Sequence, residues 1–270
     1  MKTRIAGGLV LAAGIIGAAS CLMVMEPVDS EQPGVPLAAR QEIHRTLEFE
    51  PGGTLSLQNA LGDVDISGWD KDQVDVLAKV NGNETNEEAR IRLLGPWNYG
   101  PDADIRKTDH SVAINTRPAE LGRKPQRLDY SINVPSSIDL RRIVVDRGDV
   151  TLSDLYGRLD VDVKDGSLKV ENFSGSINGA IGTGQADIEV LDIRPDDVMT
   201  VIVQRGDITL RLQPDANIRI DAQAPDGEVT SDLDMGQVLP ARTLKGRMGE
   251  GAAGITLKAL AGNIRILKTS

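Results

Sequence analysis

Residues 148–184 read GDVTLSDLYGRLDVDVKDGSLKVENFSGSINGAIGTG, and a repeat within them decides the fold. After most of its regularly spaced glycines, apolar and polar residues alternate. Alternation with period two is typical of a strand with one buried face, and a glycine before each short strand supplies the turn. The glycines stand nine residues apart, at Gly148, Gly157, Gly166, Gly175 and Gly184.

A period of nine residues fits one strand and one turn. Two such units, about 18 residues, would complete one coil of a flattened β-solenoid, with neighbouring coils roughly 4.8 Å apart. The sequence therefore predicts an all-β, β-solenoid-like fold. A β-sandwich is the alternative, because short strands at similar intervals are also typical of sandwiches.

The same pattern continues more loosely on both sides of this segment. Towards the C-terminus, Gly206-Asp207-Ile208, Gly227-Glu228-Val229, Gly254-Ile255 and Gly262-Asn263-Ile264 start further strands after longer gaps, which predicts coils with enlarged loops. Strands are expected in the first half at residues 47–49, 55–57, 62–66, 74–77, 112–114 and 128–134.

One short helix and one long loop are expected in the first half. Thr85-x-x-Glu88 has the pattern of a capping box and predicts a helix near residues 86–93. Residues 95–107 contain Gly95-Pro96 and Gly100-Pro101, which favour an excursion loop.

The N-terminus carries a targeting signal. Lys2 and Arg4 precede 21 uncharged residues, 5–25, which would be roughly 31 Å long as a helix. The basic flank predicts that this end stays in the cytoplasm and the remainder is exported. We therefore divide the chain into a membrane anchor or signal segment (1–25), a linker with three prolines (26–43) and an all-β domain (44–267). That domain is less regular over 44–135 and regular over 136–267.

Three outcomes are open for the N-terminal segment. Its length fits an uncleaved single-span anchor. Cys21 follows Ala18-Ala19-Ser20, which resembles a bacterial lipobox, although Ala18 stands where Leu is usual, so Cys21 is a candidate for lipidation. Small residues at 18 and 20 also permit simple cleavage after Ser20. Each outcome places the β domain outside the cytoplasm, and the first two hold it in the cell envelope, anchored to the membrane.

The composition limits the kinds of partner. The net charge is −10, which argues against nucleic acid, whose binding proteins concentrate Lys and Arg on a surface. Aromatic residues make up only 3% of the chain, so the core must consist mainly of Val, Ile, Leu and Ala. The single cysteine excludes an intrachain disulfide.

No catalytic or cofactor-binding pattern stands out. The two histidines, His44 and His110, lack zinc-binding spacing, and no Gly-x-Ser-x-Gly pattern is present. The glycine-rich stretch 179–184 lacks the residue order of a phosphate-binding loop. We therefore expect no enzyme activity, no catalytic residue, no metal and no cofactor.

Acidic residues follow several of the turn glycines. Asp63, Asp149 and Asp207 occupy this position, and stacked coils could align them into a row that binds calcium or a sugar. The simpler interpretation is that Asp bonds backbone amides at turns. Two Arg-Gly-Asp tripeptides, at 147–149 and 205–207, match the integrin-binding motif but belong to the same strand starts.

The recurring phrases resemble the bacterial putative-adhesin family, which is related to the head domains of autotransporter adhesins. The resemblance spans roughly residues 44–267. It rests on the Gly-Asp-Val/Ile starts at Gly62, Gly148 and Gly206, the dyad Gly68-Trp69, the strand 130–135 and the nine-residue glycine ladder. It implies a β-solenoid-like fold in an envelope protein of unknown function, with no catalytic residues.

The sequence thus favours a non-enzymatic envelope protein whose adhesin-like β domain binds a partner or acts as a scaffold. The partner would be an envelope protein or a glycan, and the membrane would be reached through the N-terminal segment. Two alternatives remain: a glycan-active enzyme on a β-helix scaffold, and an envelope-stress sensor that acts through a membrane partner.

Overall fold

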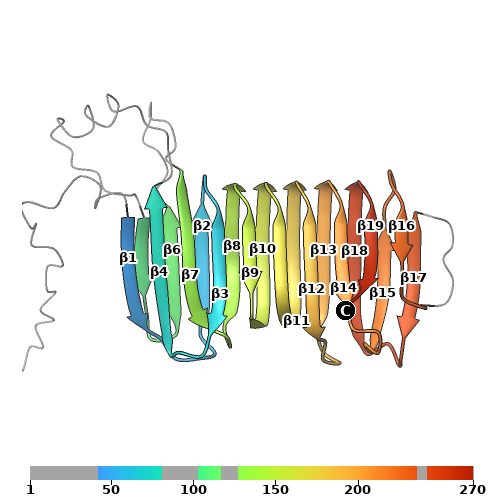
Figure 1. Ribbon diagram of the computed structural model, residues 1–270, viewed down its shortest axis with the longest axis horizontal. Helices are drawn as coiled ribbons and strands as arrows, with labels where there is room; N and C mark the ends of the chain where they lie inside the picture. The colour runs from blue at the N-terminus through green and yellow to red at the C-terminus, as the bar shows by residue number, and fades with distance from the viewer. Residues whose placement is uncertain (1–41, 81–102, 117–126, 236–241, 270) are drawn as a thin grey trace, which may run out of the picture. The chain divides into compact units, whose positions relative to one another are not determined.

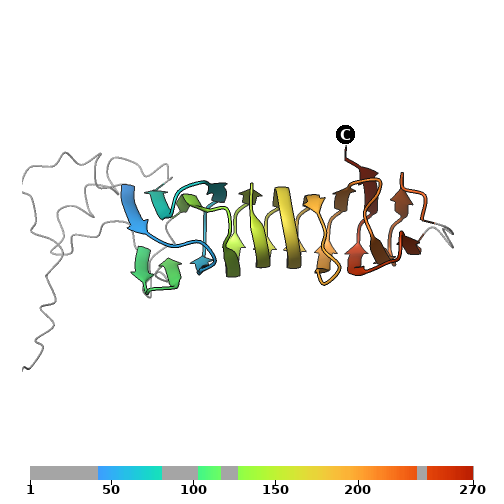
Figure 2. The same cartoon turned by 90° about the horizontal axis from the view of Figure 1, so that it is seen from below.

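The structure is a computed structural model that describes residues 42–80, 103–116, 127–235 and 242–269. Every regular element in these residues is a β-strand, and the 19 strands share one continuous network of backbone hydrogen bonds. The strands lie side by side in Figure 1, and the view in Figure 2 separates them into two layers. Each layer is a ladder of strands, and the core lies between the two.

The first layer, called here the long-strand ladder, holds the longest strands of the middle coils. In spatial order it contains β5 (Ala103–Lys107), β6 (Ser111–Thr116), β2 (Thr54–Asn59), β8 (Asp139–Arg147), β10 (Tyr156–Asp165), the second part of β11 (Leu168–Thr183), β13 (Val198–Arg205), β18 (Ala253–Ala261), β15 (Ile218–Gln223) and β17 (Thr243–Met248).

The second layer, the short-strand ladder, closes each coil on the opposite side of the core. In spatial order it contains β1 (Glu42–Glu48), β4 (Gln73–Val80), β7 (Leu128–Pro135), β3 (Val64–Trp69), β9 (Val150–Ser153), the first part of β11, β12 (Ala186–Asp192), β14 (Ile208–Leu212), β19 (Ile264–Lys268) and β16 (Val229–Ser231).

The predicted coil of two glycine-to-glycine units is confirmed in the middle of the domain. Leu168 pairs in parallel with Val150 on one side and with Ala186 on the other, and each partner is two of these units away along the chain. The two strands of a coil are unequal, because β9 has 4 residues and β10 has 10. The nine-residue spacing of the glycines therefore marks two kinds of turn and not two equal strands. Beyond Gly184 the coil becomes longer, as the pairing of Ile177 with Met199 shows.

Glycine is required at the turns because neighbouring coils touch there. A Cβ atom on Gly166 would lie 1.9 Å from the carbonyl oxygen of Gly148, and one on Gly184 would lie 2.0 Å from that of Gly166. Gly175 approaches Gly157 in the same way at the other side of the coil. The five glycines of the sequence ladder thus form two columns, each with one glycine per coil. Gly166 also has φ 150°, a conformation that side chains disfavour.

The core consists of inward-facing branched side chains, as the composition predicted. Along β10, Leu159, Val161 and Val163 are buried, and the residues between them face out. Phe173 is buried where β11 bends from one ladder to the other. Rows of Val, Ile and Leu fit between closely spaced ladders, which explains the scarcity of large rings.

Three sequence-based expectations need comment. The β-sandwich alternative is wrong, because neighbouring strands of the middle coils pair in parallel, coil on coil. The loop expected over 95–107 is wrong for 103–107, which form β5; this edge strand pairs antiparallel with β6, and Ile105 packs against the core. The short helix near 86–93 is not confirmed: it lies outside the described residues, which contain no helix.

The two ends depart from sequential stacking. At the C-terminal end, β18 pairs with both β13 and β15, so the last coil of the chain (β18 and β19) lies between two earlier ones. At the other end, the coil of β2 and β3 lies between that of β6 and β7 and that of β8 and β9. Antiparallel strands then close the stack, through β1, β4 and β5 at one end and β17 at the other.

Candidate functional site

The acidic residues of the turns serve the backbone of the neighbouring coil. Asp63 Oδ1 accepts a hydrogen bond from the Asp149 backbone N–H at 3.0 Å, and Asp149 Oδ1 accepts one from the Ser167 N–H at 2.7 Å. Asp207 Oδ1 accepts one from the Asn263 N–H at 2.8 Å. The turn interpretation is therefore correct in kind, but the amide lies on the next coil and not within the same turn. These carboxylates join coils together.

Arginines neutralise part of this acidic column. Arg127 forms ion pairs with Asp63 and with Asp129, the second at 3.1 Å. Asp207 faces Arg265 at 3.8 Å. Within the described residues, no three His, Cys, Asp or Glu side chains are grouped so that they could hold a metal ion.

The two Arg-Gly-Asp tripeptides are parts of these turns. Asp149 and Asp207 use their carboxylates in the hydrogen bonds between coils described above. The Arg205 guanidinium donates to Thr183 Oγ1 at 2.8 Å, across one coil spacing. Both tripeptides therefore act as structural corners, and no projecting loop carries them.

The remaining sequence candidates also have structural roles. His44 is exposed on β1 and contacts Asp75 at 2.9 Å, whereas His110 offers its backbone carbonyl to Thr54. Most of the glycine-rich stretch 179–184 is strand, since β11 continues to Thr183. Cys21 lies outside the described residues and stays a prediction. No helix long and apolar enough to cross a membrane occurs in the described part of the chain.

A buried polar cluster stabilises the N-terminal end of the stack. The Asn59 side-chain amide donates to the backbone carbonyls of Leu128 at 2.8 Å and Gly62 at 3.1 Å. Its oxygen accepts a hydrogen bond from Thr116 Oγ1 at 2.9 Å, and that hydroxyl also contacts the Tyr130 hydroxyl at 3.0 Å. Burial raises the pKa of Tyr130, and the hydrogen bond with Thr116 opposes this only in part. The cluster is structural, because its polar atoms form hydrogen bonds with one another and with neighbouring backbone carbonyls.

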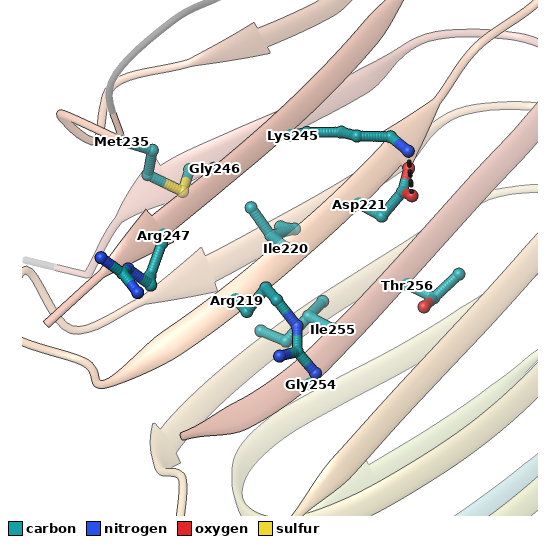
Figure 3. Close-up of a pocket in the computed structure, with 10 residues that line it drawn as sticks. All are labelled: Arg219, Ile220, Asp221, Met235, Lys245, Gly246, Arg247, Gly254, Ile255 and Thr256. Atoms are coloured by element: carbon teal, nitrogen blue, oxygen red, sulfur yellow. Dashed lines mark ion pairs between the residues drawn. The ribbon is translucent and has the colours of Figure 1, made fainter. Parts of the chain in front are cut away.

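The best candidate for a binding site is a groove on the outer surface of the long-strand ladder, near its C-terminal end. It has a volume of about 760 Å³ and lies over β15, β17 and β18. Figure 3 shows Arg219 and Asp221 projecting from β15, and Lys245 and Arg247 from the neighbouring β17. These side chains face outward because Ile218, Ile220 and Ala222 alternate with them and point into the core.

The charges in the groove differ from one row to the next. Asp221 and Lys245 are register partners and form an ion pair at 3.1 Å. Arg219 and Arg247 are also register partners, so two positively charged residues stand at directly opposed positions of the two strands, with their guanidinium groups directed to opposite sides in Figure 3. Neither arginine has an ion pair or side-chain hydrogen bond with another described residue. The groove therefore has guanidinium donors that it can offer to a ligand.

Small residues make this part of the ladder hollow. A Cβ on Gly254 would meet no atom within 4 Å, so this position on β18 leaves open space below Arg219, its register partner. Gly246 on β17 lies against Met235, whose side chain borders the groove in Figure 3. Sequence reasoning missed this groove. Alternation places Arg219 on the outside, but only the antiparallel β17 brings Arg247 opposite to it.

A second, smaller hollow lies on the same surface over β10, β11 and β13. Its volume is about 430 Å³, and Ala180 and Gly182 form its floor. Lys164 at its rim forms an ion pair with Asp146, and this contact raises the pKa of the lysine. Because its lysine is already paired, this hollow offers fewer donors to a ligand than the groove near the C-terminal end.

One comparison with known protein families agrees with this architecture. Residues 136–267 match the family model described as Toastrack DUF4097. This segment is therefore similar to the Toastrack family, and we call it the Toastrack segment. The match confirms the resemblance to the putative-adhesin family and a β-solenoid-like fold for the Toastrack segment. No curated protein matches the sequence.

Solved structures are also similar to this chain. A putative cell adhesion protein from Clostridium sporogenes is 17% identical, with a TM-score of 0.45, over 84% of this chain and all (100%) of that one. A putative adhesin from Bacteroides fragilis is 13% identical, with a TM-score of 0.35, over 83% of this chain and 96% of that one. A putative adhesin from Parabacteroides distasonis is 11% identical, with a TM-score of 0.28, over the same shares of 83% and 96%.

Proposed function

We propose that this chain is a non-enzymatic binding or scaffold protein of the cell envelope. Residues 1–25 and the linker 26–43 would hold its β domain outside the cytoplasm, through a single-span anchor or a lipid on Cys21. The domain would present its outer surface to an envelope protein or a glycan. The Toastrack match and the extended parallel ladders support this proposal.

One observation carries the proposal: the turns are occupied by contacts between coils, whereas a hollow on the outer surface of the long-strand ladder holds two arginines without a carboxylate partner in the described part of the chain. Asp63, Asp149 and Asp207 are engaged in joining coils. The groove with Arg219 and Arg247 has guanidinium groups to offer a ligand. A rigid surface with available donors is suited to recognition, because the protein need not reorganise to bind.

Affinity capture from intact envelopes tests the binding function. The full-length chain carries a C-terminal tag, is cross-linked in whole cells, and is recovered in detergent for mass spectrometry of proteins and sugar analysis of glycans. We expect one enriched partner that a tag-only control lacks. Recovery of no protein and no glycan above that control would contradict the proposal.

The tether is tested separately by the intact mass of the native protein. A lipid-modified Cys21 gives a chain that begins at residue 21 with added acyl mass, and a Cys21→Ser variant loses that mass. An uncleaved anchor gives the full-length mass in both proteins. A mature chain without residues 1–20 and without lipid would contradict both forms of tether.

A further inference from the structure

Two arginines occupy directly opposed positions of β15 and β17, in the groove over β15, β17 and β18. Arg219 and Arg247 are direct partners across an antiparallel pair of strands, and like charges in this position reduce stability. The chain has 40 acidic residues and a net charge of −10, yet neither guanidinium has a carboxylate partner among the described residues. The nearest acidic residue on β15, Asp221, is paired with Lys245 at 3.1 Å. An unfavourable pair of this kind fits a site whose counter-charge comes from a ligand.

The surroundings of the two arginines leave room for such a ligand. Gly254 is the register partner of Arg219 on β18, and a Cβ there would find no atom within 4 Å. In Figure 3 the Arg219 side chain extends towards Gly254, and Arg247 lies on the side of Met235. The two guanidinium groups are thus directed to opposite sides of the groove in Figure 3, so an extended ligand with more than one anionic group can contact both.

We propose that Arg219 and Arg247 each bind a carboxylate of an acidic oligosaccharide, in a glycan that contains uronic acids. Guanidinium groups bind carboxylates through paired, charge-assisted hydrogen bonds. Thr256 and Asp221 line the same groove and provide a hydroxyl group and acceptor oxygens for the hydroxyl groups of the sugar. This inference rests on the proposed binding function and names the class of ligand.

Two other ligand classes fit the groove less well. None of the described residues that line it is aromatic, so a neutral sugar would find no ring on which to stack. A polyphosphate chain has no hydroxyl groups to donate to the Asp221 carboxylate, which would repel it. A ligand with isolated carboxylates between hydroxyl groups matches the mixture of two arginines, one threonine and one aspartate.

Titration calorimetry of the full-length protein in detergent, with an oligogalacturonate as the probe, tests the proposal. The fully methyl-esterified oligomer and inorganic phosphate serve as comparison ligands. We expect the oligogalacturonate to bind, with an affinity that falls as salt is added, and the ester and phosphate to bind far more weakly. Either Arg219→Ala or Arg247→Ala should weaken binding roughly tenfold to a hundredfold, and the double variant should abolish it.

Arg158→Ala is the matched control. Arg158 is an exposed arginine on β10, in the same ladder but away from the groove, and its loss removes the same charge. It should leave binding of the oligogalacturonate unchanged. Equal weakening by Arg158→Ala, no binding by the wild-type protein, or phosphate bound as tightly as the uronate would each overturn the proposal.

The thermal midpoint of the ligand-free variants separates a binding role from a structural one. Removal of one of two opposed positive charges should leave the midpoint unchanged or raise it, whereas a structural pair would give a lower midpoint. Capture from cells then separates this inference from the proposed function. If the double variant no longer binds uronate but still recovers the envelope partner, only the assignment of uronate as the ligand of the partner site is refuted. A wild-type chain that recovers nothing would refute the binding function itself.

Discussion

The middle coils and the two ends of the stack use different means to reach the same ladder. From β8 to β14, each coil follows the previous one and pairs in parallel with the next coil along the chain. At the ends, the chain returns to insert a coil, and antiparallel strands form the edges, except at β16, which pairs in parallel with β19. Repetition therefore specifies the middle, whereas non-local pairing specifies the ends. Antiparallel edges also interrupt the parallel template on which a further coil would stack.

The largest expected effect comes from breaking the glycine column of the middle coils. Gly166→Val would place its Cβ 1.9 Å from the Gly148 carbonyl oxygen, a backbone atom that cannot move without displacing a coil. We expect a loss of unfolding free energy of about 4 kcal/mol or more, or no soluble protein. Urea unfolding followed by circular dichroism measures this loss.

Gly254→Ala is the control for that experiment. This glycine also lies within the stack, but its Cβ would meet no atom within 4 Å, so its unfolding midpoint should stay close to that of the wild-type protein. Equal sensitivity at both positions would contradict the argument that contact between coils, and not glycine as such, is required.

An intermediate loss of stability is expected at the N-terminal end of the stack, where the buried Asn59 side chain joins neighbouring segments. Asn59→Ala removes the donor to the Leu128 and Gly62 carbonyls and leaves those groups without this partner. The unfolding free energy should fall by about 1–3 kcal/mol. Hydrogen exchange should then show faster opening of β2, β6 and β7 than of β10 and β11. Uniform acceleration along the whole stack would show that the ends and the middle unfold as one unit.

A smaller effect is expected from one carboxylate of the acidic column. Asp149→Ala removes a single hydrogen bond to the Ser167 N–H at an exposed turn and should cost about 1 kcal/mol. Asp149→Asn keeps an acceptor oxygen in the same place and should recover most of this loss. If both variants were equally unstable, the charge of Asp149 would matter more than its contact with the next coil.

The smallest effect is on stability at low pH, and it involves Asp75 at the N-terminal edge of the stack. Partial burial acts to raise the pKa of Asp75, but hydrogen bonds from Thr46 and His44 outweigh it and hold that pKa below its ordinary value. A carboxyl group whose pKa is lowered on folding contributes stability above its unfolded pKa, and this contribution is lost as the pH falls through the folded one. Stability should therefore decline between about pH 5 and about pH 2, and less steeply in Asp75→Asn. A decline of equal steepness in the variant would assign acid sensitivity to other residues.

The sequence predicted the middle of the fold well because its signals are local. Glycine at each turn and Val or Leu at alternate positions determine the strand, its buried face and the length of the coil. The order of coils at the ends could not be predicted in the same way. Gly206-Asp207-Ile208 and Gly262-Asn263-Ile264 are similar phrases, and similarity shows that both begin strands of one ladder but not that they are neighbours.

The groove could not be predicted for a related reason. Alternation in Ile218-Arg219-Ile220 shows that Arg219 faces outward, and that part was accessible from sequence. Its partner Arg247 lies further along the chain, beyond β16. It becomes a neighbour only through an antiparallel pairing that the glycine repeat does not predict. The turn aspartates, by contrast, were visible in the sequence, although their true acceptor role depends on the spacing between coils.

The position of the last coil has a consequence for the synthesis of the protein. Because β18 and β19 lie between the coil of β13 and β14 and the coil of β15 and β16, they are synthesised after both of these coils and then complete an interior layer. Until they arrive, β13 and β15 each lack a neighbour that the finished domain provides, and the backbone groups along one edge of each strand stay unpaired. A chain interrupted before residue 253 would therefore lack an interior coil and not the coil at the edge of the stack.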